Sequence, residues 1–502
     1  MESAPPLAVV TGVGALTPLG RDAPTMWQAL LAGGSGIREL YEPWAGDLPV
    51  RIAAPVAAEP GAAPGERGFG RLDRSAQLAV VAAREAWADA GLGPAPDALR
   101  GTDPDPSRGM DPDPSRGTCP DPSRDTGQDA PRGSGGAPGA RNGPGPEPHT
   151  GPGAGDGPGT GTRRGAGGGC PDPFVRPEDV AVVVGTGHGP QGMVLSSYER
   201  LKERGANLVS PYAMPMYLVN TAAAQVGIAV GARAGVYTVA SACASGAEAV
   251  AFGLELIRSG RAKVVVAGGT DATVTSLTIA AFAAMRALSR RTGDPTEASR
   301  PFDRSRDGFV VGEGAGMVVL EDAALAGARG AGAYCEVAGG GVTSDGHHIA
   351  QPFTDGRGLA DAMRLALRQA GESADRVALV NAHATSTPIG DAAEARALRA
   401  LFGRRLPEVP VCAPKSGMGH LQGAAGAVET VITALSLHHR TVPPTLNSYD
   451  TEEHVGLELV LDKPRPLPDG SLVALNNSLG FGGHNVAVVQ RTLPAGVLGR
   501  SR

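Results

Sequence analysis

The stretch VYTVASACASGAEAVAFGLELIRSG, at residues 236–260, decides the fold that this sequence predicts. It opens with apolar, β-branched residues, passes through a cluster of small residues, and then places apolar residues at helical spacing. This pattern predicts a buried strand, a tight turn and a helix.

Cys243 lies in the turn, at the N-terminus of the predicted helix. Unpaired backbone N–H groups and the helix dipole favour an anion there, so we expect the thiolate to be stabilised relative to the thiol. The small neighbouring residues leave room for a substrate carbonyl, which indicates a site of covalent catalysis. The alternative is a small buried hydrophobic side chain, the state of most free cysteines.

Apolar runs alternate with helical stretches along most of the chain. Because these runs are continuous rather than alternating, we expect strands that are buried on both faces and covered by helices, hence an α/β protein. The runs lie at 7–13, 181–185, 236–240, 262–267, 316–320, 334–338, 377–381, 409–412, 472–475 and 485–489.

The two halves of the chain resemble each other. AVVTGVGALTP at 8–18 is similar in kind to YCEVAGGGVTS at 334–344, and the cysteine turn has a counterpart in VPVCAPKSGMGH at 409–420. A duplicated α/β unit would bring two equivalent turns together around a pseudo-twofold axis. Cys243 would then face the turn that carries His420.

The composition excludes several function classes. The charged fraction is 19% and the formal net charge is −6, which gives no basis for nucleic-acid binding. Five cysteines without even spacing argue against a disulfide framework, and no paired CxxC suggests a metal site. Neither a signal peptide nor an apolar run of about 18 residues is present, so we expect a cytoplasmic protein with no membrane contact.

Residues 93–173 interrupt the α/β pattern. The segment repeats DPDPSRG at 103–109 and 111–117 and is otherwise dominated by Gly and Pro, so it cannot bury enough apolar surface to fold. We predict a disordered insertion that leaves the fold as a surface loop; the alternative is an arm that docks a partner. The rest divides into an N-terminal half at 1–330, a C-terminal half at 331–492 and a tail at 493–502.

Three polar clusters could complete a catalytic site. His383 follows a predicted strand in VNAHATSTPIGD at 380–391, where it is a candidate acid, base or donor. His420 and Lys415 share a small-residue turn at 413–427, and Phe481 lies among glycines in NNSLGFGGHN at 476–485, a loop that could present a backbone N–H. Taken singly, each has a plainer alternative: a structural loop histidine, a solvated lysine or an ordinary glycine turn.

One cysteine followed by two histidines in these contexts resembles the β-ketoacyl-acyl-carrier-protein synthases, the elongating ketosynthases of type II fatty acid and polyketide systems. Further similar blocks are VVTGVGALTPLG at 9–20, VVVAGGTDA at 264–272 and SRPFDRSRDGFVVGEGAGMVVLE at 299–321. The resemblance covers residues 6–92 and 176–491. It implies a thiolase-like duplicated α-β-α-β-α layered fold with two halves related by a pseudo-twofold axis.

The resemblance also implies a mechanism. Cys243 would take an acyl group from a carrier-protein thioester, and malonyl-carrier protein would then lose CO2 so that its enolate attacks this acyl group. His383 and His420 would stabilise the enolate oxygen through N–H donors. The backbone N–H groups of Cys243 and Phe481 would form the oxyanion hole, with the Phe481 ring as a gate to the acyl pocket.

Other positions take supporting roles by resemblance. Lys415 would organise the histidines together with Asp391 and Glu394, while Thr385 and Thr387 would bind the phosphopantetheine arm of the acyl carrier protein. No separate cofactor is implied.

Further residues would shape the pocket and the docking surface. His188 and Ala213 stand at acyl-pocket positions. The expected docking residues for an acidic carrier protein, each also plausible as a plain surface arginine, are Arg67, Arg71, Arg74 and Arg286.

The chain would work as a homodimer, or as a heterodimer with a chain-length partner. Departures from the family pattern at His188, Ala213, Ala350 and Ala384 suggest a polyketide or unusual fatty-acyl substrate. Two alternatives stay open: a non-catalytic chain-length partner, against which the presence of Cys243 argues, and a Cys–His hydrolase.

Overall fold

A computed structural model describes residues 5–63, 66, 68–93, 174–451 and 456–493 of the chain. The predicted insertion at 93–173 falls outside the described residues apart from its first position, and so does all but the first residue of the predicted tail. Arg67 also lies outside them.

The first half supplies five strands of an 11-stranded sheet, in the spatial order β5-β4-β6-β7-β1. β4 runs parallel to β5 and β6, whereas β7 is antiparallel to both β6 and β1. Their bounds are β1 (Ala8–Leu16), β4 (Val180–Gly185), β5 (Gly235–Val239), β6 (Val264–Asp271) and β7 (Gly314–Asp322).

The second half repeats this arrangement in the order β10-β9-β14-β15-β8. If the five strands of each half are numbered 1 to 5 along the chain, both halves have the spatial order 3-2-4-5-1. In the second half, as in the first, strand 5 is antiparallel to both its neighbours. The bounds are β8 (Cys335–Ser344), β9 (Val377–Asn381), β10 (Pro410–Cys412), β14 (Val473–Gly480) and β15 (His484–Arg491). The predicted duplication is therefore confirmed by topology.

Short pairings complete the strands. β1 and β8 pair antiparallel and join the two halves, and β12 (Glu458–Leu459) extends the sheet beside β10. Two separate two-stranded sheets contain β2 (Arg38–Glu39), β3 (Ile52–Ala53), β11 (Thr441–Val442) and β13 (Arg465–Pro466).

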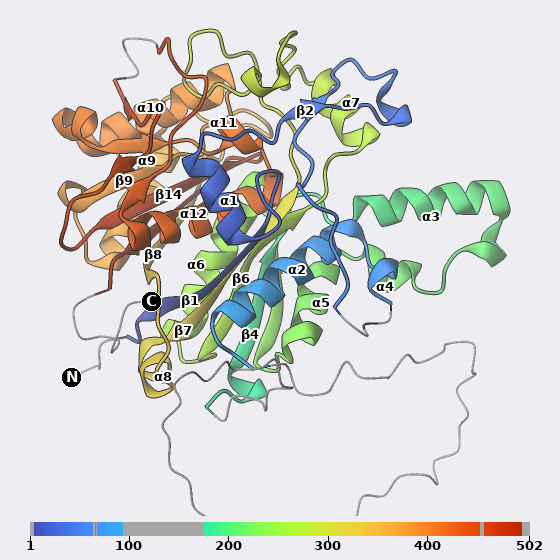
Figure 1. The fold of residues 1–502 in the computed structure, drawn as a ribbon, viewed down its shortest axis with the longest axis horizontal. Helices are drawn as coiled ribbons and strands as arrows, with labels where there is room; N and C mark the ends of the chain where they lie inside the picture. Colours follow the sequence, from blue (N-terminus) through green and yellow to red (C-terminus); the bar gives the residue numbers. More distant parts are fainter. Residues whose placement is uncertain (1–4, 64–65, 67, 94–173, 452–455, 494–502) are drawn as a thin grey trace, which may run out of the picture. The chain divides into compact units, whose positions relative to one another are not determined.

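Two equivalent helices, α6 (Ser245–Arg258) and α12 (Ala425–His439), pack against each other and contact strands of both halves (Figure 1). α6 follows β5, and α12 follows β10. A glycine on each helix permits the close approach, since a Cβ on Gly246 would lie 2.8 Å from the Ala427 nitrogen and one on Gly426 would lie 2.8 Å from the Ala247 Cβ.

The outer faces carry other helices. Successive residues of β4 point to opposite faces: Val182 packs in one cluster with α2 (Arg74–Asp89) and α5 (Thr221–Val230), and Val183 packs with α6 and α12. In the second half, α9 (Arg357–Ala370) covers β8 and β15, and α10 (Pro388–Phe402) lies on α9. Burial on both faces explains the continuous apolar runs and gives the expected α-β-α-β-α layers.

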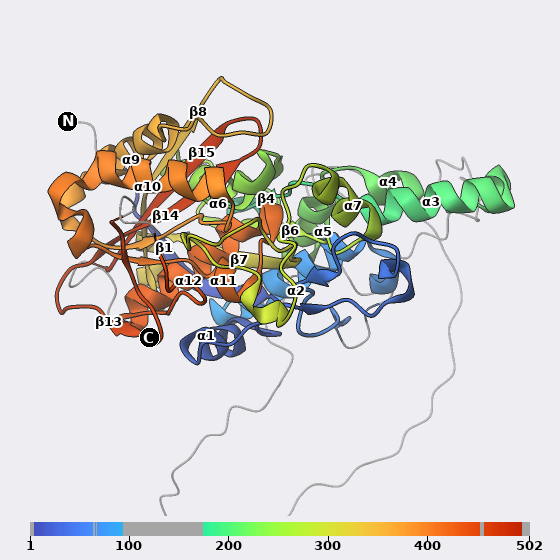
Figure 2. The same cartoon turned by 90° about the horizontal axis from the view of Figure 1, so that it is seen from above.

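The remaining α-helices are shorter or peripheral. They are α1 (Ala23–Leu31), α3 (Gln191–Arg204), α4 (Ala213–Tyr217), α7 (Ser276–Ala284), α8 (Ala323–Ala328) and α11 (Lys415–Met418). α3 has no buried residue and extends away from the sheet (Figure 2). None of the helices in the described ranges is both long enough and apolar enough to cross a membrane.

Candidate active site

Two equivalent 3₁₀ turns lead into the central helices. Ala242–Ala244 precedes α6 and Gln422–Ala424 precedes α12, and their first residues share a left-handed backbone, with φ 52° at Ala242 and φ 51° at Gln422. A non-glycine residue in this region is strained, so the tertiary packing must hold both turns in place. The counterpart of the cysteine turn is thus this 422–424 turn, just after the predicted 409–420 stretch.

The turns face each other, as the predicted duplication requires. The Cys243 Sγ donates a hydrogen bond to the Gln422 Oε1 at 3.4 Å. Both residues line a cavity of about 370 Å³ that also brings together six of the predicted site residues. These are His383, His420, Thr385, Thr387, Phe481 and Arg286.

The electrostatics of Cys243 differ from the expectation. Burial raises the pKa of the Cys243 thiol to about 12, and the nearby Asp271 carboxylate adds to this, while Lys415 acts against it. The predicted stabilised thiolate is therefore wrong for the resting enzyme, because the desolvation of a buried anion outweighs the favourable helix terminus. Hydrogen bonding by the backbone N–H groups of Phe481 and Cys243 acts the other way and lowers the pKa of this thiol.

The two histidines meet at the cavity from different elements. His383 follows β9 and His420 lies between α11 and α12; their ring centroids are 5.4 Å apart and their planes are perpendicular, at 89°. Burial, followed by the positive charge of Lys415, holds the pKa of both imidazoles well below its ordinary value. Both rings are therefore neutral at pH 7, so each has one N–H donor and one lone pair.

Lys415 is buried and its ammonium pairs with Glu429 of α12. The expected partner Asp391 instead faces Arg306, 3.6 Å away, and accepts the backbone N–H of Phe302 at 2.8 Å. The prediction that Asp391 pairs with Lys415 is wrong, and Glu429 was missed. A carboxylate within an otherwise apolar helix was the available signal, because such a group is rarely buried unpaired.

Glu394 holds the loop that carries His383 through hydrogen bonds to its backbone. Its carboxylate accepts the backbone N–H groups of His383 at 2.9 Å and Ala384 at 2.7 Å. Burial raises the pKa of Glu394, and it raises the pKa of Glu429 to about 7 against the opposing effect of Lys415. Lys415 therefore lies close to two buried carboxyl groups, those of Glu394 and Glu429.

Thr385 and Thr387 form a polar shelf at the cavity, with their hydroxyl oxygens 3.0 Å apart. The loop reaches this shape through left-handed backbone at Ala384, with φ 28°, and at Ser386, with φ 71°. The Arg306 guanidinium donates to the carbonyl oxygen of Pro388 at 3.0 Å and supports the shelf from behind.

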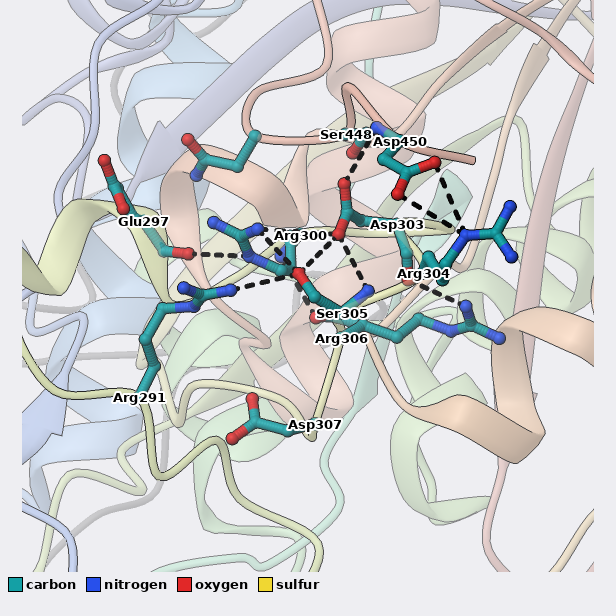
Figure 3. Close-up of polar contacts among 12 residues, drawn as sticks. Arg291, Glu297, Arg300, Asp303, Arg304, Ser305, Arg306, Asp307, Ser448 and Asp450 are labelled. Carbon is teal, nitrogen blue, oxygen red and sulfur yellow. Dashed lines mark hydrogen bonds and ion pairs between the residues drawn. The ribbon is translucent and has the colours of Figure 1, made fainter. Parts of the chain in front are cut away.

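A charged network on the loop 299–309 continues outward from this shelf (Figure 3). Asp303 accepts the Ser305 hydroxyl at 2.6 Å, and the same hydroxyl accepts Arg291 at 3.0 Å and Arg300 at 2.9 Å. The backbone N–H of Arg300 donates to the Ser386 hydroxyl at 3.0 Å. The shelf and the basic loop are thus one connected unit.

The predicted docking arginines occupy different settings. Arg286 is exposed and lines the cavity, and Arg71 is exposed with its guanidinium 5.4 Å from the Tyr212 ring centre. Arg74 is bound by Glu59 at 2.6 Å and by the buried Glu313 at 2.8 Å. Arg74 is thus paired with two carboxylates, and its docking role stays a prediction.

Neither His188 nor Ala213 lines the cavity that holds Cys243. Burial acts to lower the pKa of His188, but the Asp271 carboxylate, 3.6 Å from the His188 Nδ1, raises it. Ala213 is buried at the start of α4. Their assignment to an acyl pocket stays a prediction.

Asp271, at the end of β6, is a further residue that the sequence did not single out. Its buried carboxylate accepts the Gly187 N–H at 2.9 Å from the first half and the Gly423 N–H at 2.7 Å from the second. It thereby ties the loop after β4 to the 422–424 turn. In the part of the chain that the structure describes, no cluster of His, Cys, Asp and Glu side chains could hold a metal ion.

Comparison with known proteins agrees with this geometry. The model of the beta-ketoacyl synthase N-terminal domain matches residues 8–104 and 167–326, and that of the beta-ketoacyl synthase C-terminal domain matches residues 334–449. The chain is 35% identical over 486 residues to 3-oxoacyl-(acyl-carrier-protein) synthase 2 of Mycobacterium tuberculosis, which covers 96% of each sequence.

Solved structures give the same result. The ishigamide ketosynthase/chain length factor superposes with a TM-score of 0.74 at 25% identity, over 98% of this chain and 100% of that one. A beta-ketoacyl synthase from Burkholderia phymatum superposes with a TM-score of 0.73 at 28% identity, over 97% of this chain and 100% of that one.

Proposed function

The chain belongs to the β-ketoacyl synthase family, and we propose on that premise that Cys243 carries the acyl group which this acyltransferase condenses with malonyl-acyl-carrier protein. The observation that carries the proposal is the cavity in which Cys243 meets two neutral imidazoles and the Phe481 turn. We place the boundary between the two ketosynthase halves near residue 330, between β7 and β8.

Acylation comes first. The sulfur of Cys243 attacks the thioester carbonyl of an acyl-carrier protein, and its proton passes to a neutral imidazole. The oxyanion that forms accepts the backbone N–H groups of Cys243 and Phe481, whose effect on the pKa of the thiol supports their place beside the sulfur. When the carbon–sulfur bond of the carrier breaks, the imidazole returns the proton to the departing thiolate.

Condensation follows on the same cysteine. The malonyl group loses CO2, and the negative charge that develops on its thioester oxygen is stabilised by N–H donors of His383 and His420. The enolate carbon attacks the acyl carbon, and the bond to Cys243 breaks to give a thiolate, which takes up a proton from water and returns to the thiol. A 3-oxoacyl thioester two carbons longer leaves on the carrier protein. Because both pKa values lie well below 6.5, the imidazoles can act as neutral donors throughout.

Lys415 and Glu394 act through these histidines. The Lys415 ammonium adds to the effect of burial, which is the main cause of the lowered pKa of both imidazoles, and the Glu394 carboxylate fixes the backbone from which His383 extends. Asp391 supports the same loop by accepting the Ser386 N–H at 3.1 Å. These are positioning residues.

The substrates arrive on the phosphopantetheine arm of an acyl carrier protein, so no separate cofactor is needed. The hydroxyl groups of Thr385 and Thr387 can hydrogen-bond the amides of that arm as it enters the cavity. Arg286, exposed at the same cavity, offers a cation to an acidic carrier protein.

The first half also offers a surface for a second subunit. β5 ends the sheet, and its Val236 is 42% exposed. Ile228 on α5 and Tyr198 on α3 are exposed on neighbouring helices. An exposed apolar strand edge of this kind favours pairing with another chain, either a copy of this one or a chain-length partner.

Mass spectrometry of the intact protein tests the function. Incubation with acyl-carrier protein should add one acyl group on Cys243, and addition of malonyl-carrier protein should release a product two carbons longer. Cys243→Ala should form no adduct, whereas the control Cys335→Ala, in the buried β8, should still form it. A wild-type protein that never acquires an adduct would instead be a non-catalytic partner subunit.

A further inference from the structure

Gln422 is a buried polar residue beside the nucleophile that the proposed mechanism leaves without a role. Its side chain lines the cavity and is 1% exposed. The Oε1 accepts the Cys243 thiol at 3.4 Å, and the Nε2 donates to the His420 carbonyl oxygen at 3.4 Å. The amide is therefore placed between the reacting sulfur and the histidine turn.

The backbone around Gln422 holds the amide in this place. The residue itself has a left-handed backbone, and the next N–H, that of Gly423, donates to the buried Asp271 at 2.7 Å. A polar group that is fixed and only 1% exposed cannot turn to water when its partner changes. Its hydrogen bonds must come from whatever occupies the cavity.

Acylation removes the partner of the Gln422 Oε1, because an acylated sulfur carries no proton. The acyl carbonyl oxygen is directed to the N–H groups of Cys243 and Phe481, so it does not replace that partner. The next carbons of the acyl chain then lie beside the amide. Methylene groups leave the Oε1 without a donor and the second Nε2–H without an acceptor, since the first Nε2–H already donates to His420. An oxo or hydroxyl oxygen on the third carbon can accept that second N–H, and a hydroxyl there can also donate to the Oε1.

We propose that Gln422 is a specificity-determining residue that selects acyl groups with an oxygen near the thioester, the 3-oxoacyl and 3-hydroxyacyl class, over saturated chains. The inference rests on the proposed function, because it concerns the acyl group on Cys243. A 3-oxoacyl group is also what one condensation produces. The enzyme would therefore act in successive condensations that are not each followed by complete reduction of the new carbonyl.

The test compares acylation rates of matched substrates. The kcat/KM for acylation of Cys243 is measured with 3-oxoacyl, 3-hydroxyacyl and saturated acyl groups of equal chain length on the same carrier protein. We expect the wild-type enzyme to favour the oxygenated groups about ten- to hundredfold, the discrimination that an unpaired buried polar group provides. Gln422→Met keeps the unbranched shape without the amide, so this ratio should fall toward one through loss of rate with the oxygenated groups.

A matched control and the opposing outcomes complete the design. Gln28→Met makes the same substitution at an exposed position of α1 and should leave the ratio unchanged. If the wild-type enzyme acylates with oxygenated and saturated groups at a kcat/KM ratio near one, the proposal is overturned, even if the Gln422 variant does not fold. It is also overturned if Gln422→Met keeps the wild-type ratio. Adducts that form without discrimination refute the role of Gln422 alone, whereas the absence of any adduct refutes the proposed function.

Discussion

Removal of the Lys415 ammonium should cost stability in a manner that depends on pH. Lys415 and Glu429 are each 1% exposed and pair with each other. Lys415→Met leaves the Glu429 carboxyl group buried without its cation. Breaking a buried pair in this way lowers the free energy of unfolding by about 3–5 kcal/mol while the remaining group stays charged.

Glu429 can reduce this cost by binding a proton. Its pKa is already raised to about 7 by burial, against the effect of Lys415, and loss of the lysine raises it further. A carboxyl group with a raised pKa binds more protons in the folded state, so its contribution to stability is lost as the pH rises through that pKa. In the wild type, Glu429 is almost fully ionised at pH 8, so its contribution to the free energy of unfolding falls little further. In the variant, the higher pKa lets this contribution keep falling at pH 8. The stability deficit of Lys415→Met should therefore grow by about 1.4 kcal/mol between pH 6 and pH 8.

Urea unfolding followed by circular dichroism at pH 6, 7 and 8 measures this deficit. The control Lys415→Met/Glu429→Leu removes both charges; its deficit should be smaller and should not change with pH, since an apolar replacement of a buried pair is often neutral. Equal and pH-independent deficits in the single and double variants would refute the reasoning.

Three further outcomes are expected. Alkylation of Cys243 by iodoacetamide should keep rising about tenfold per pH unit from pH 7 to 9.5, because burial raises the pKa of its thiol to about 12; a plateau near pH 9 would contradict this. In steady-state kinetics, Arg286→Ala should raise the KM for acyl-carrier protein severalfold but leave the KM for an acyl-pantetheine thioester unchanged. Arg74→Ala should leave both KM values unchanged, and urea unfolding should show a free energy of unfolding lower by about 1–3 kcal/mol. Gly246→Ala should lower the free energy of unfolding by about 1–3 kcal/mol, because its Cβ would lie 2.7 Å from the Gly423 carbonyl oxygen; an unchanged melting temperature would count against the close packing of α6 and α12.

The strands and the turns could be predicted from sequence because short-range pattern determines them. The run at 377–381 coincides with β9, and the run at 236–240 differs from β5 by one residue at each end. The run at 262–267 begins two residues before β6 and stops before Gly268 and Gly269, whereas β6 continues through these glycines to Asp271. Cys243, His383 and His420 could be chosen because each follows a strand or begins a helix among small residues.

The features of the site that were not predicted from the sequence depend on contacts between distant segments. Glu429 and Asp271 matter because folding buries them beside particular partners, which no local pattern records. The thiol state of Cys243 likewise reflects desolvation rather than its place at a helix terminus. The pairing of Arg74 could not be predicted either, because its buried partner Glu313 is 239 positions away in sequence.

The two duplicated turns differ at the position of the proposed nucleophile, Cys243. Gly423 occupies the position in the second turn that Cys243 occupies in the first, and a Cβ there would lie 2.3 Å from the Gly187 nitrogen and 2.8 Å from an Asp271 oxygen. No side chain, and hence no second sulfur, fits at that position. With Cys243 as the proposed nucleophile, the pair of turns can therefore hold one acyl group, and the 422–424 turn can vary in sequence without carrying a second nucleophile.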